Sequence, residues 1–317
     1  MDVLKLDERD DWLELATRAF RYDFHHLPFY HALAQEAGEG EAHLFVYRDG
    51  GDFVALPLLL RQVRTMPCHD ESGRGWWHGT SVYGYAGPLV SRPDLPTSVL
   101  EAFRVELAEE LDRRQVASVF SRLHPLLEQR PVLQGLGELA DHGQTVSIDL
   151  TLPADVQRTH FRSTHKRHLN KLARAGATWE YDPTGAHLEA FADCYDQSMR
   201  RVGATSSYDF GLEHFRRFFD TDDVEAFLGV VRIGDDVAAA GLFTRCGAII
   251  QAHLNGTSDR YLPLSPAKMM YDGTRLWATE QGATFLHIGG GLGGGEDPLF
   301  NFKAGFSRQR HAFVLWR

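Results

Sequence analysis

Near the C-terminus, a run of glycines and a lysine form the part of the chain best suited to chemistry. Six of the seven residues at 289–295 are glycine, directly after a short apolar stretch. Because glycine has no Cβ atom, backbone N–H groups in such a turn can come close to a ligand. Asp297 predicts a helix N-cap, Pro298 the first helical position and Gly305 the end of that short helix. The helix would hold Lys303 beside the glycines, near a loop that could admit a substrate.

A basic segment is the second chemical feature. No acidic residue occurs between Val156 and Trp179. The basic residues in this interval are Arg158, His160, Arg162, His165, Lys166, Arg167, His168, Lys171 and Arg174. Periodicity predicts one helix at 158–175, ended by Gly176, with its cations on two stripes. Such a concentration in an acidic chain indicates a phosphate-bearing partner, or else a solvated helix face whose charges meet acidic neighbours.

These two features need a scaffold, and hydrophobic periodicity predicts a mixed α/β one. Further helices are predicted at 11–37 (two pieces, broken near Leu27-Pro28), 99–113, 187–202, 212–219 and 266–281. Strands are predicted at 42–47, 52–60, 116–120, 146–150, 177–181, 224–233, 238–246, 248–254 and 284–288. Each half thus consists of helices, an antiparallel meander, and a further helix and strand, which indicates one fold used twice.

Length and composition bound the class of protein. The chain has 317 residues, of which 43% are hydrophobic and 24% charged. These values suit a soluble protein of two domains, each of about 150 residues. No apolar run approaches the roughly 20 residues of a membrane-spanning helix, so no stable membrane insertion is expected. The first residues lack a secretory pattern, and three dispersed cysteines favour a reducing cytoplasm. The net charge of -10 excludes coating of nucleic acid through bulk electrostatics.

Four short motifs occur along the chain. They are 83–89 (Tyr-Gly-Tyr-Ala-Gly-Pro-Leu), 160–177 (the basic segment, ending Ala-Gly-Ala), 264–268 (Leu-Ser-Pro-Ala-Lys) and 302–306 (Phe-Lys-Ala-Gly-Phe). In that order they resemble motifs of the FemABX family of non-ribosomal, tRNA-dependent aminoacyltransferases. The resemblance extends from the first of these motifs to the C-terminus.

The resemblance implies two tandem GNAT-like domains that face each other across a cleft. Each would be a largely antiparallel mixed sheet flanked by helices. Residues 1–150 would form the acceptor side, and 151–317 would hold the basic helix, the glycine loop and the Phe-Lys motif, with the last strand returning to the first domain. Family members move an amino acid from aminoacyl-tRNA to an amine and form an amide bond. The acceptor is a peptidoglycan precursor or a small molecule of natural-product biosynthesis.

The resemblance also implies roles for individual residues. Lys303 would stabilise charge at the ester carbonyl under attack, with Phe302 helping to position it. The alternative for Lys303 is a surface lysine favoured by the helix dipole. Phosphates of the tRNA would contact Arg162, Lys166, Arg167 and Lys171. The acceptor would contact Arg201, Tyr83, Tyr85, Tyr208 and His253, although aromatic side chains such as those of Tyr83 and Tyr85 more often pack in a core.

Departures from the family pattern favour a small or unusual acceptor over a nucleotide-linked cell-wall precursor. His253 stands where a tyrosine is expected, three residues before Gly256. The stretch 27–35 contains no lysine that could bind phosphate in the first domain. The long coiled-coil arm of some members is absent from the sequence as well.

Two other classes of function stay open. An acyl-CoA-dependent GNAT N-acyltransferase would use acetyl-CoA, but the stretch 260–266 lacks the glycines that let a backbone cradle pyrophosphate. A non-catalytic RNA- or glycan-binding module is the other class, and the intact Phe302-Lys303 pair argues against it.

No resident cofactor is expected, because aminoacyl-tRNA would act as a co-substrate. No metal is expected either. Cys68-His69-Asp70 together with His78 offers ligand types, but a single cysteine and loose spacing do not suit zinc. The sequence does not specify the amino acid, the acceptor, the general base or the oligomeric state.

Overall fold

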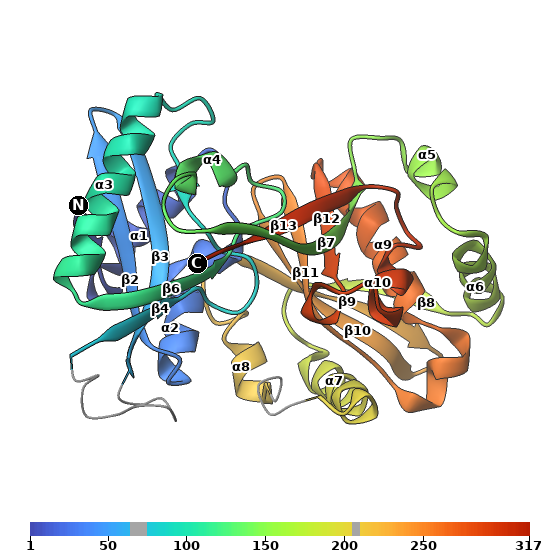
Figure 1. Cartoon of the computed structure of the whole chain (residues 1–317). Coiled ribbons are helices and arrows are strands. Elements are labelled where there is room, and N and C mark those ends of the chain that lie inside the picture. Colours follow the sequence, from blue (N-terminus) through green and yellow to red (C-terminus); the bar gives the residue numbers. More distant parts are fainter. Residues whose placement is uncertain (64–74, 205–209) are drawn as a thin grey trace. The chain divides into compact units, whose positions relative to one another are not determined.

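The computed structural model describes residues 1–63, 75–204 and 210–317, and Figure 1 traces the chain. Contacts within the chain divide it into two compact units. Unit 1 is Met1–Gly143 with Ala312–Arg317, and unit 2 is Gln144–His311. Both units contain helices and strands, so the predicted mixed α/β class is confirmed. None of the helices in the described ranges combines the length and apolar character that a bilayer crossing demands.

Unit 1 is built on a sheet with the strand order β1-β2-β3-β4-β6-β13. The strands are β1 (Asp2–Leu4), β2 (Glu41–Asp49), β3 (Asp52–Gln62), β4 (Trp77–Thr80), β6 (Val116–Arg122) and β13 (Arg310–Trp316), and β5 (Leu89–Val90) pairs with β3 off this path. Strands β2 and β3 form a hairpin: Asp49 lies opposite Asp52, and Gly50 adopts φ +58° in the turn between them, as an Asp-Gly pair between two strands favours.

The described helices of unit 1 contain buried side chains, except the short η1. They are η1 (Leu6–Glu8), α1 (Arg9–Arg18), η2 (Phe24–His26), α2 (Pro28–Glu36), α3 (Thr97–Arg113) and α4 (Arg130–Leu133). The predicted break near Leu27-Pro28 is confirmed, since Pro28 opens α2 in the position where proline fits a helix. On α3, Phe103 and Leu107 are buried in one core cluster with Leu56 of β3.

Unit 2 is built on strands in the order β7-β12-β11-β10-β9-β8. They are β7 (Leu139–Asp149), β8 (Thr178–Asp182), β9 (Glu225–Ile233), β10 (Asp236–Cys246), β11 (Ile249–Thr257) and β12 (Phe285–Gly290). Neighbouring strands are antiparallel except β11 and β12, which run parallel.

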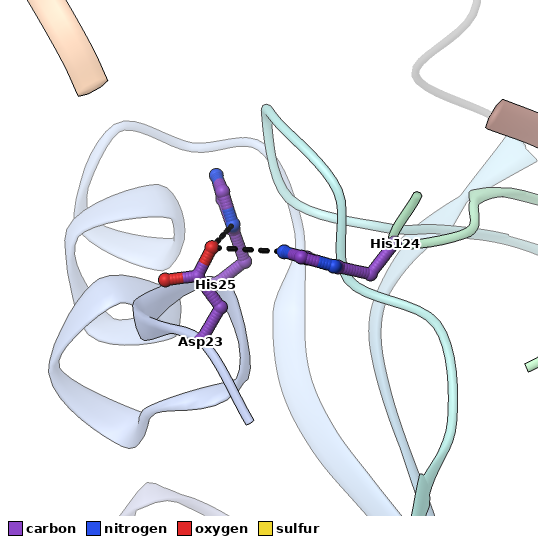
Figure 2. A group of neighbouring side chains, drawn as sticks. All are labelled: Asp23, His25 and His124. Atoms are coloured by element: carbon purple, nitrogen blue, oxygen red, sulfur yellow. Dashed lines mark hydrogen bonds and ion pairs between the residues drawn. The ribbon is translucent and has the colours of Figure 1, made fainter. Parts of the chain in front are cut away.

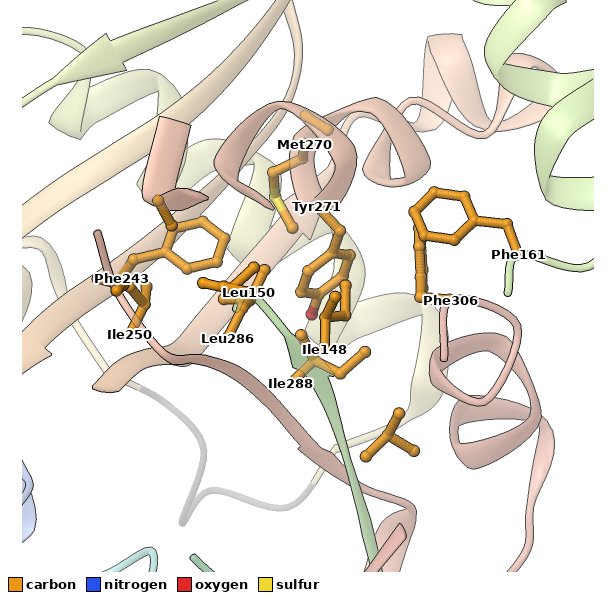
Figure 3. Close-up of a cluster of buried hydrophobic side chains, with 14 of the residues drawn as sticks. Ile148, Leu150, Phe161, Phe243, Ile250, Met270, Tyr271, Leu286, Ile288 and Phe306 are labelled. Atoms are coloured by element: carbon orange, nitrogen blue, oxygen red, sulfur yellow. The ribbon is translucent and has the colours of Figure 1, made fainter. Parts of the chain in front are cut away.

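Helices cover both faces of the unit 2 sheet. They are α5 (Ala154–Thr159), α6 (Ser163–Arg174), α7 (Leu188–Val202), α8 (Leu212–Arg216), η6 (Asp259–Leu264), α9 (Ala267–Glu280), η7 (Leu292–Gly294) and α10 (Pro298–Lys303). Met270 and Tyr271 of α9 belong to the core cluster that contains Ile148 and Leu286 of the sheet (Figure 3). Phe161 and Phe306 extend this cluster toward α6 and α10.

The basic segment forms two helices, so the prediction of one helix at 158–175 is wrong. The chain leaves the helical path between α5 and α6, where Phe161 is buried against Phe306 at 5.3 Å between ring centroids. Burial of this aromatic side chain outweighs the propensity to continue the helix. Because Arg158 lies on α5 and Arg162 precedes α6, these two cations do not share one helical stripe, contrary to the prediction. Gly176 follows α6 with φ +73°, as predicted for a helix end.

Glycines mark where helices pack most closely on the sheet of unit 2. A Cβ atom on Gly241 would meet Met270 Sδ of α9 at 2.7 Å. One on Gly256 would meet the peptide between Cys194 and Tyr195 of α7 at 2.3 Å. Gly241 and Gly256 lie in neighbouring pairs of the β10–β11 ladder, so they face opposite sides of the sheet. Helices α9 and α7 therefore cover opposite faces.

We expect Gly256→Ala to destabilise the protein by about 3 kcal/mol, at the upper end of overpacking costs. The added methyl group would meet backbone atoms of α7, which cannot rotate away as a side chain can. Urea unfolding of the variant measures the loss. Gly211→Ala is the matched control, because the space around Gly211 is open, and it should change the free energy of unfolding by less than about 0.5 kcal/mol. Equal effects of the two substitutions would contradict the direct contact between α7 and β11.

Candidate functional site

The two central strands of unit 2 separate at one end. The parallel register of β11 and β12 covers three pairs, Ile249–Gln251 with Phe285–His287. Beyond them β12 follows β7 through a register shift between His287 and Gly289, while β11 follows β10. Such irregularities often re-aim a strand next to a functional site. Past the third pair, the facing edges of β11 and β12 are not joined to each other by a ladder in the described residues, so backbone groups there can serve other partners.

The glycine turn follows β12 and is packed against other parts of unit 2. Gly289 has φ +74°, and a Cβ atom there would lie 3.1 Å from Lys303 Nζ. A Cβ atom on Gly290 would lie 2.7 Å from the Gln144 carbonyl oxygen, and one on Gly291 would lie 2.1 Å from that of Gly295. We predicted that a ligand would come close to these glycines, but the protein's own backbone occupies part of the space beside them.

The helix after the turn begins as the sequence predicts. The Asp297 carboxylate accepts hydrogen bonds from the backbone N–H groups of Phe300 at 2.8 Å and Leu292 at 3.1 Å. Pro298 occupies the first helical position of α10. Asp297 thus fixes both the glycine turn and the start of α10, and α10 ends at Lys303.

Lys303 lies against the end of β12. Its Nζ donates a hydrogen bond to the Gly290 carbonyl oxygen at 2.8 Å. Burial of the ammonium group, partly offset by Asp297, lowers the pKa of Lys303 to about 8. One N–H of the ammonium is used by Gly290, which leaves others for an oxygen of a ligand. The lysine therefore combines a positive charge with a desolvated position at a strand end.

The basic helix α6 holds α10 in place. His165 Nε2 donates to the Phe302 carbonyl oxygen at 2.9 Å, and the Arg162 backbone N–H donates to the Gly305 carbonyl oxygen at 2.8 Å. A Cβ atom on Gly305 would lie 2.3 Å from His165 Cε1. Gly305 does not adopt positive φ, so it makes room for His165 rather than forming a left-handed helix cap. The Phe302 ring packs 5.6 Å from that of His165, which suits a residue that positions α10.

The four predicted phosphate contacts divide into two kinds. The Arg162 guanidinium donates to the Asn301 carbonyl oxygen at 3.0 Å, and Lys166 Nζ donates to that of Thr159 at 3.1 Å. Arg167 and Lys171 are exposed on α6. All four keep their charge on the side of unit 2 that carries α6, but Arg167 and Lys171 are the better placed for an outside partner.

Two residues predicted to bind the acceptor lie in unit 2. Arg201 pairs with Asp259 and donates to Ser198 Oγ at 2.9 Å, so its charge is already compensated. His253 of β11 is half-buried beside Phe218, with 5.2 Å between ring centroids. Tyr208 lies outside the described residues, as do the cysteine, histidine and aspartate at 68–70.

The other two acceptor candidates lie in unit 1. Tyr83 is 39% exposed, and its carbonyl oxygen accepts a hydrogen bond from Tyr30 Oη at 3.1 Å. Tyr85 packs on Phe313 with 5.4 Å between ring centroids and lies 6.1 Å from the ring of His25. The aromatic segment is therefore partly core and partly surface, and its role toward an acceptor stays a prediction.

A buried polar cluster in unit 1 is the site that sequence analysis missed. Asp23 Oδ2 accepts from His124 Nε2 at 3.0 Å and lies 3.3 Å from His25 Nδ1 (Figure 2). Burial alone would raise the pKa of Asp23, yet its hydrogen bonds with the two histidines hold that pKa well below its usual range. His124 is 101 residues from Asp23, so sequence spacing carries no signal of this contact.

The residues of this cluster do not fit a metal ion. In the described ranges, the potential ligand atoms of Asp23, His25 and His124 all lie within 4.8 Å of one another. The backbone N–H of Leu126, however, donates to His124 Nδ1 at 3.2 Å. The proton of a neutral His124 ring must then lie on Nε2, the atom that faces Asp23, and that nitrogen has no lone pair for a metal. In the described structure the cluster is a buried pairing of Asp23 with the two histidines.

Unit 1 should lose stability in mild acid. Burial lowers the pKa of His26 and His31 to about 3, so both stay neutral in the folded chain. Their unfolded-state pKa is near 6.5; below it the unfolded chain binds protons that the folded chain does not. The contribution of the two histidines to the free energy of unfolding should therefore be complete above pH 6.5. It should fall toward pH 3, by about 1.4 kcal/mol per pH unit for each histidine.

Urea unfolding between about pH 7 and pH 4.5 tests this slope. His26→Gln or His31→Gln should flatten it, whereas His142→Gln, at an exposed position of unit 1, should leave it unchanged. A slope that is the same in all three variants would show that other groups govern the acid response.

Known structures share this fold. The structure of FemX matches this chain with a TM-score of 0.71 and 13% sequence identity. The match covers 99% of this chain and 97% of the FemX chain. A C-terminal DUF2156 domain from Agrobacterium fabrum, assigned to a lysylphosphatidylglycerol synthetase, has a TM-score of 0.59 and 15% identity, over 97% of this chain and 91% of that one. L-PGS from Bacillus licheniformis has a TM-score of 0.53 and 14% identity, over 91% and 90%.

Sequence comparison points the same way. The model of the acetyltransferase (GNAT) domain family matches residues 159–303, from the basic segment to Lys303. No curated protein sequence matches the chain significantly. The resemblance drawn from the four motifs is thus confirmed at the level of the fold: the chain has the fold of FemX, and its second half matches the acetyltransferase (GNAT) domain family.

Proposed function

We propose that the protein transfers an amino acid from aminoacyl-tRNA to an amine and forms an amide bond. The single observation that carries the proposal is the ammonium group of Lys303 at the end of β12, in a chain with the fold of FemX. An acyltransferase of this kind needs a donor of hydrogen bonds where the carbonyl oxygen of the ester becomes negative. Lys303 is a cation at a strand end that other parts of unit 2 hold in place.

The reaction follows from ordinary acyl-transfer chemistry. The acceptor amine attacks the ester carbonyl, the new C–N bond forms, and the C–O bond to the ribose breaks. Lys303 would stabilise the oxyanion between these two events, and its lowered pKa makes it a stronger proton donor than an exposed lysine. The amine gives up a proton, and the departing ribose hydroxyl takes one up, so the proton count balances without a resident cofactor.

The charges on α6 support an RNA donor. Arg167 and Lys171 are exposed there, and Arg162 joins α6 to α10 through its hydrogen bonds to Asn301 and Gly305. Phosphates bound along α6 would lie in a fixed relation to Lys303, because the same contacts set the position of both. Such positioning supplies much of the rate in group-transfer reactions.

The contacts of Arg201 bear on the acceptor. An arginine that grips the phosphates of a nucleotide-linked precursor should be free of strong internal partners, but Arg201 is paired with Asp259. We therefore favour a small-molecule amine, as in natural-product biosynthesis, over a peptidoglycan precursor.

An acyl-CoA-dependent N-acyltransferase is the second candidate. The match of residues 159–303 to acetyltransferase (GNAT) domains favours it. Against it, residues 260–266 contain no glycine, and η6 occupies most of this stretch with Pro263 inside it. A backbone of this kind is poorly suited to surround a pyrophosphate.

The donor can be identified by assay. Radiolabelled amino acid on a mixed pool of charged tRNA should pass to an amine acceptor from a small-amine panel, and ribonuclease added beforehand should stop transfer. Acetyl-CoA supplied without tRNA should give no product. Product formed from acetyl-CoA and insensitive to ribonuclease would establish the second candidate in place of the first.

The role of Lys303 should show in the pH profile. Transfer by the native protein should decline as pH rises through about 8, because the charged form of Lys303 is lost there. Lys303→Met should lower kcat by about 10²–10³-fold, and Lys303→Arg should retain activity at alkaline pH because arginine stays charged. Lys5→Met, at an exposed lysine of unit 1, is the control and should behave as the native protein. An alkaline limb that persists in Lys303→Arg would assign the titration to another group.

A further inference from the structure

Lys268 is a buried cation that the proposed mechanism does not use. It lies in the first turn of α9 and is 7% exposed. Its Nζ contacts Nδ1 of His168, which comes from α6. Because an ammonium group has no lone pair, the ring nitrogen must accept this hydrogen bond, and the proton of the neutral ring lies on Nε2.

The carboxylate that could pair with Lys268 is engaged elsewhere. Asp272, one turn further along α9, accepts hydrogen bonds from Arg158 at 3.0 Å and from Arg275 at 2.6 Å. In the described part of the chain, the salt bridges found do not include one to Lys268. When the hydrogen-bond acceptor of a buried ammonium group is a neutral ring, no negative charge compensates the positive charge of that group.

The charged groups that shift the pKa values of Lys268 and His168 are basic. Arg167 is the charged group that lowers the pKa of Lys268, after burial. The pKa of His168 is lowered by burial and then by Lys268, Arg167 and Lys171. Cations held together in this way repel one another, and an anion between them would remove both the repulsion and the cost of burial.

We propose that Lys268, His168 and Arg167 form a binding site for a phosphate group between α6 and the first turn of α9. Lys268 supplies a charged donor from the buried side and exposed Arg167 a second charge, while His168 holds Lys268 in place by accepting its hydrogen bond through Nδ1. A phosphate oxyanion matches this set because it accepts several hydrogen bonds and carries the missing negative charge. The inference rests on the proposed function in one respect: there, the phosphate belongs to the RNA backbone of the donor.

Thermal unfolding with inorganic phosphate tests the site itself. At equal ionic strength, phosphate should raise the Tm of the native protein above its value in chloride, since it binds the folded state. Lys268→Met should have an equal or higher Tm in chloride, because a buried unpaired charge is removed, but should lose the response to phosphate. Lys5→Met is the control for loss of one positive charge and should respond as the native protein does.

Opposite results overturn the site. Lys268→Met with a lower Tm in chloride and an unchanged phosphate response would make Lys268 a structural hydrogen-bond donor to His168. A native protein whose Tm is the same in phosphate and chloride would also reject the proposal. Arg167→Ala covers the case in which Lys268→Met does not fold, because Arg167 is exposed; it should fold and show a weakened phosphate response.

Two further titrations separate the sources of phosphate. With a fluorescent RNA minihelix that mimics a tRNA acceptor stem, Lys268→Met should reduce the salt slope of log Kd by about 1, and Lys5→Met should not. A rise in Tm with CoA that depends on Lys268, without such a change for RNA, would assign the phosphate to CoA. Phosphate binding without any tRNA-dependent transfer would leave the site intact and reject the proposed function, so the two can fail independently.

Discussion

The hydrogen bond from His165 to the Phe302 carbonyl is the contact on which the candidate site depends. Burial lowers the pKa of His165 to about 4, so the ring is neutral at physiological pH and donates through Nε2. Gly305 leaves the space that the ring needs, and the Arg162 backbone bonds the next turn of the same segment. Because of these contacts, the helix with the exposed cations and the helix with Lys303 are fixed to each other. The same contacts therefore set the position of the cations proposed to bind RNA and the position of the lysine proposed to act in catalysis.

Lys303 and Lys268 show two forms of the same physical condition. Each ammonium group is desolvated, each has a lowered pKa, and each donates to a neutral acceptor: the Gly290 carbonyl in one case and the His168 ring in the other. A folded chain selected for stability alone has little reason to bury a cation in this way. Lysines of this kind are characteristic of sites that meet negative charge in a ligand or a transition state.

Local sequence signals predicted the features that depend on neighbouring residues. Asp297 as N-cap, Pro298 as first helical residue and the turn at Gly50 all follow from backbone rules that act over a few positions. The predictions that failed depended on partners far along the chain. The helix breaks before α6 because Phe161 enters a core with Phe306, and Gly305 is glycine because His165 lies against it.

By itself, the sequence determined the mixed α/β class, most of the strands, the order of the FemABX-like motifs and the presence of a lysine after a glycine turn. Tertiary structure alone decided which charges are already paired, as Arg201 is with Asp259, and which are buried without a carboxylate, as Lys268 is. It also decided that Asp23 meets His124, across 101 residues. The physical reason is that propensity and periodicity act within a few residues, whereas burial and hydrogen-bond pairing are properties of atoms that the fold brings together.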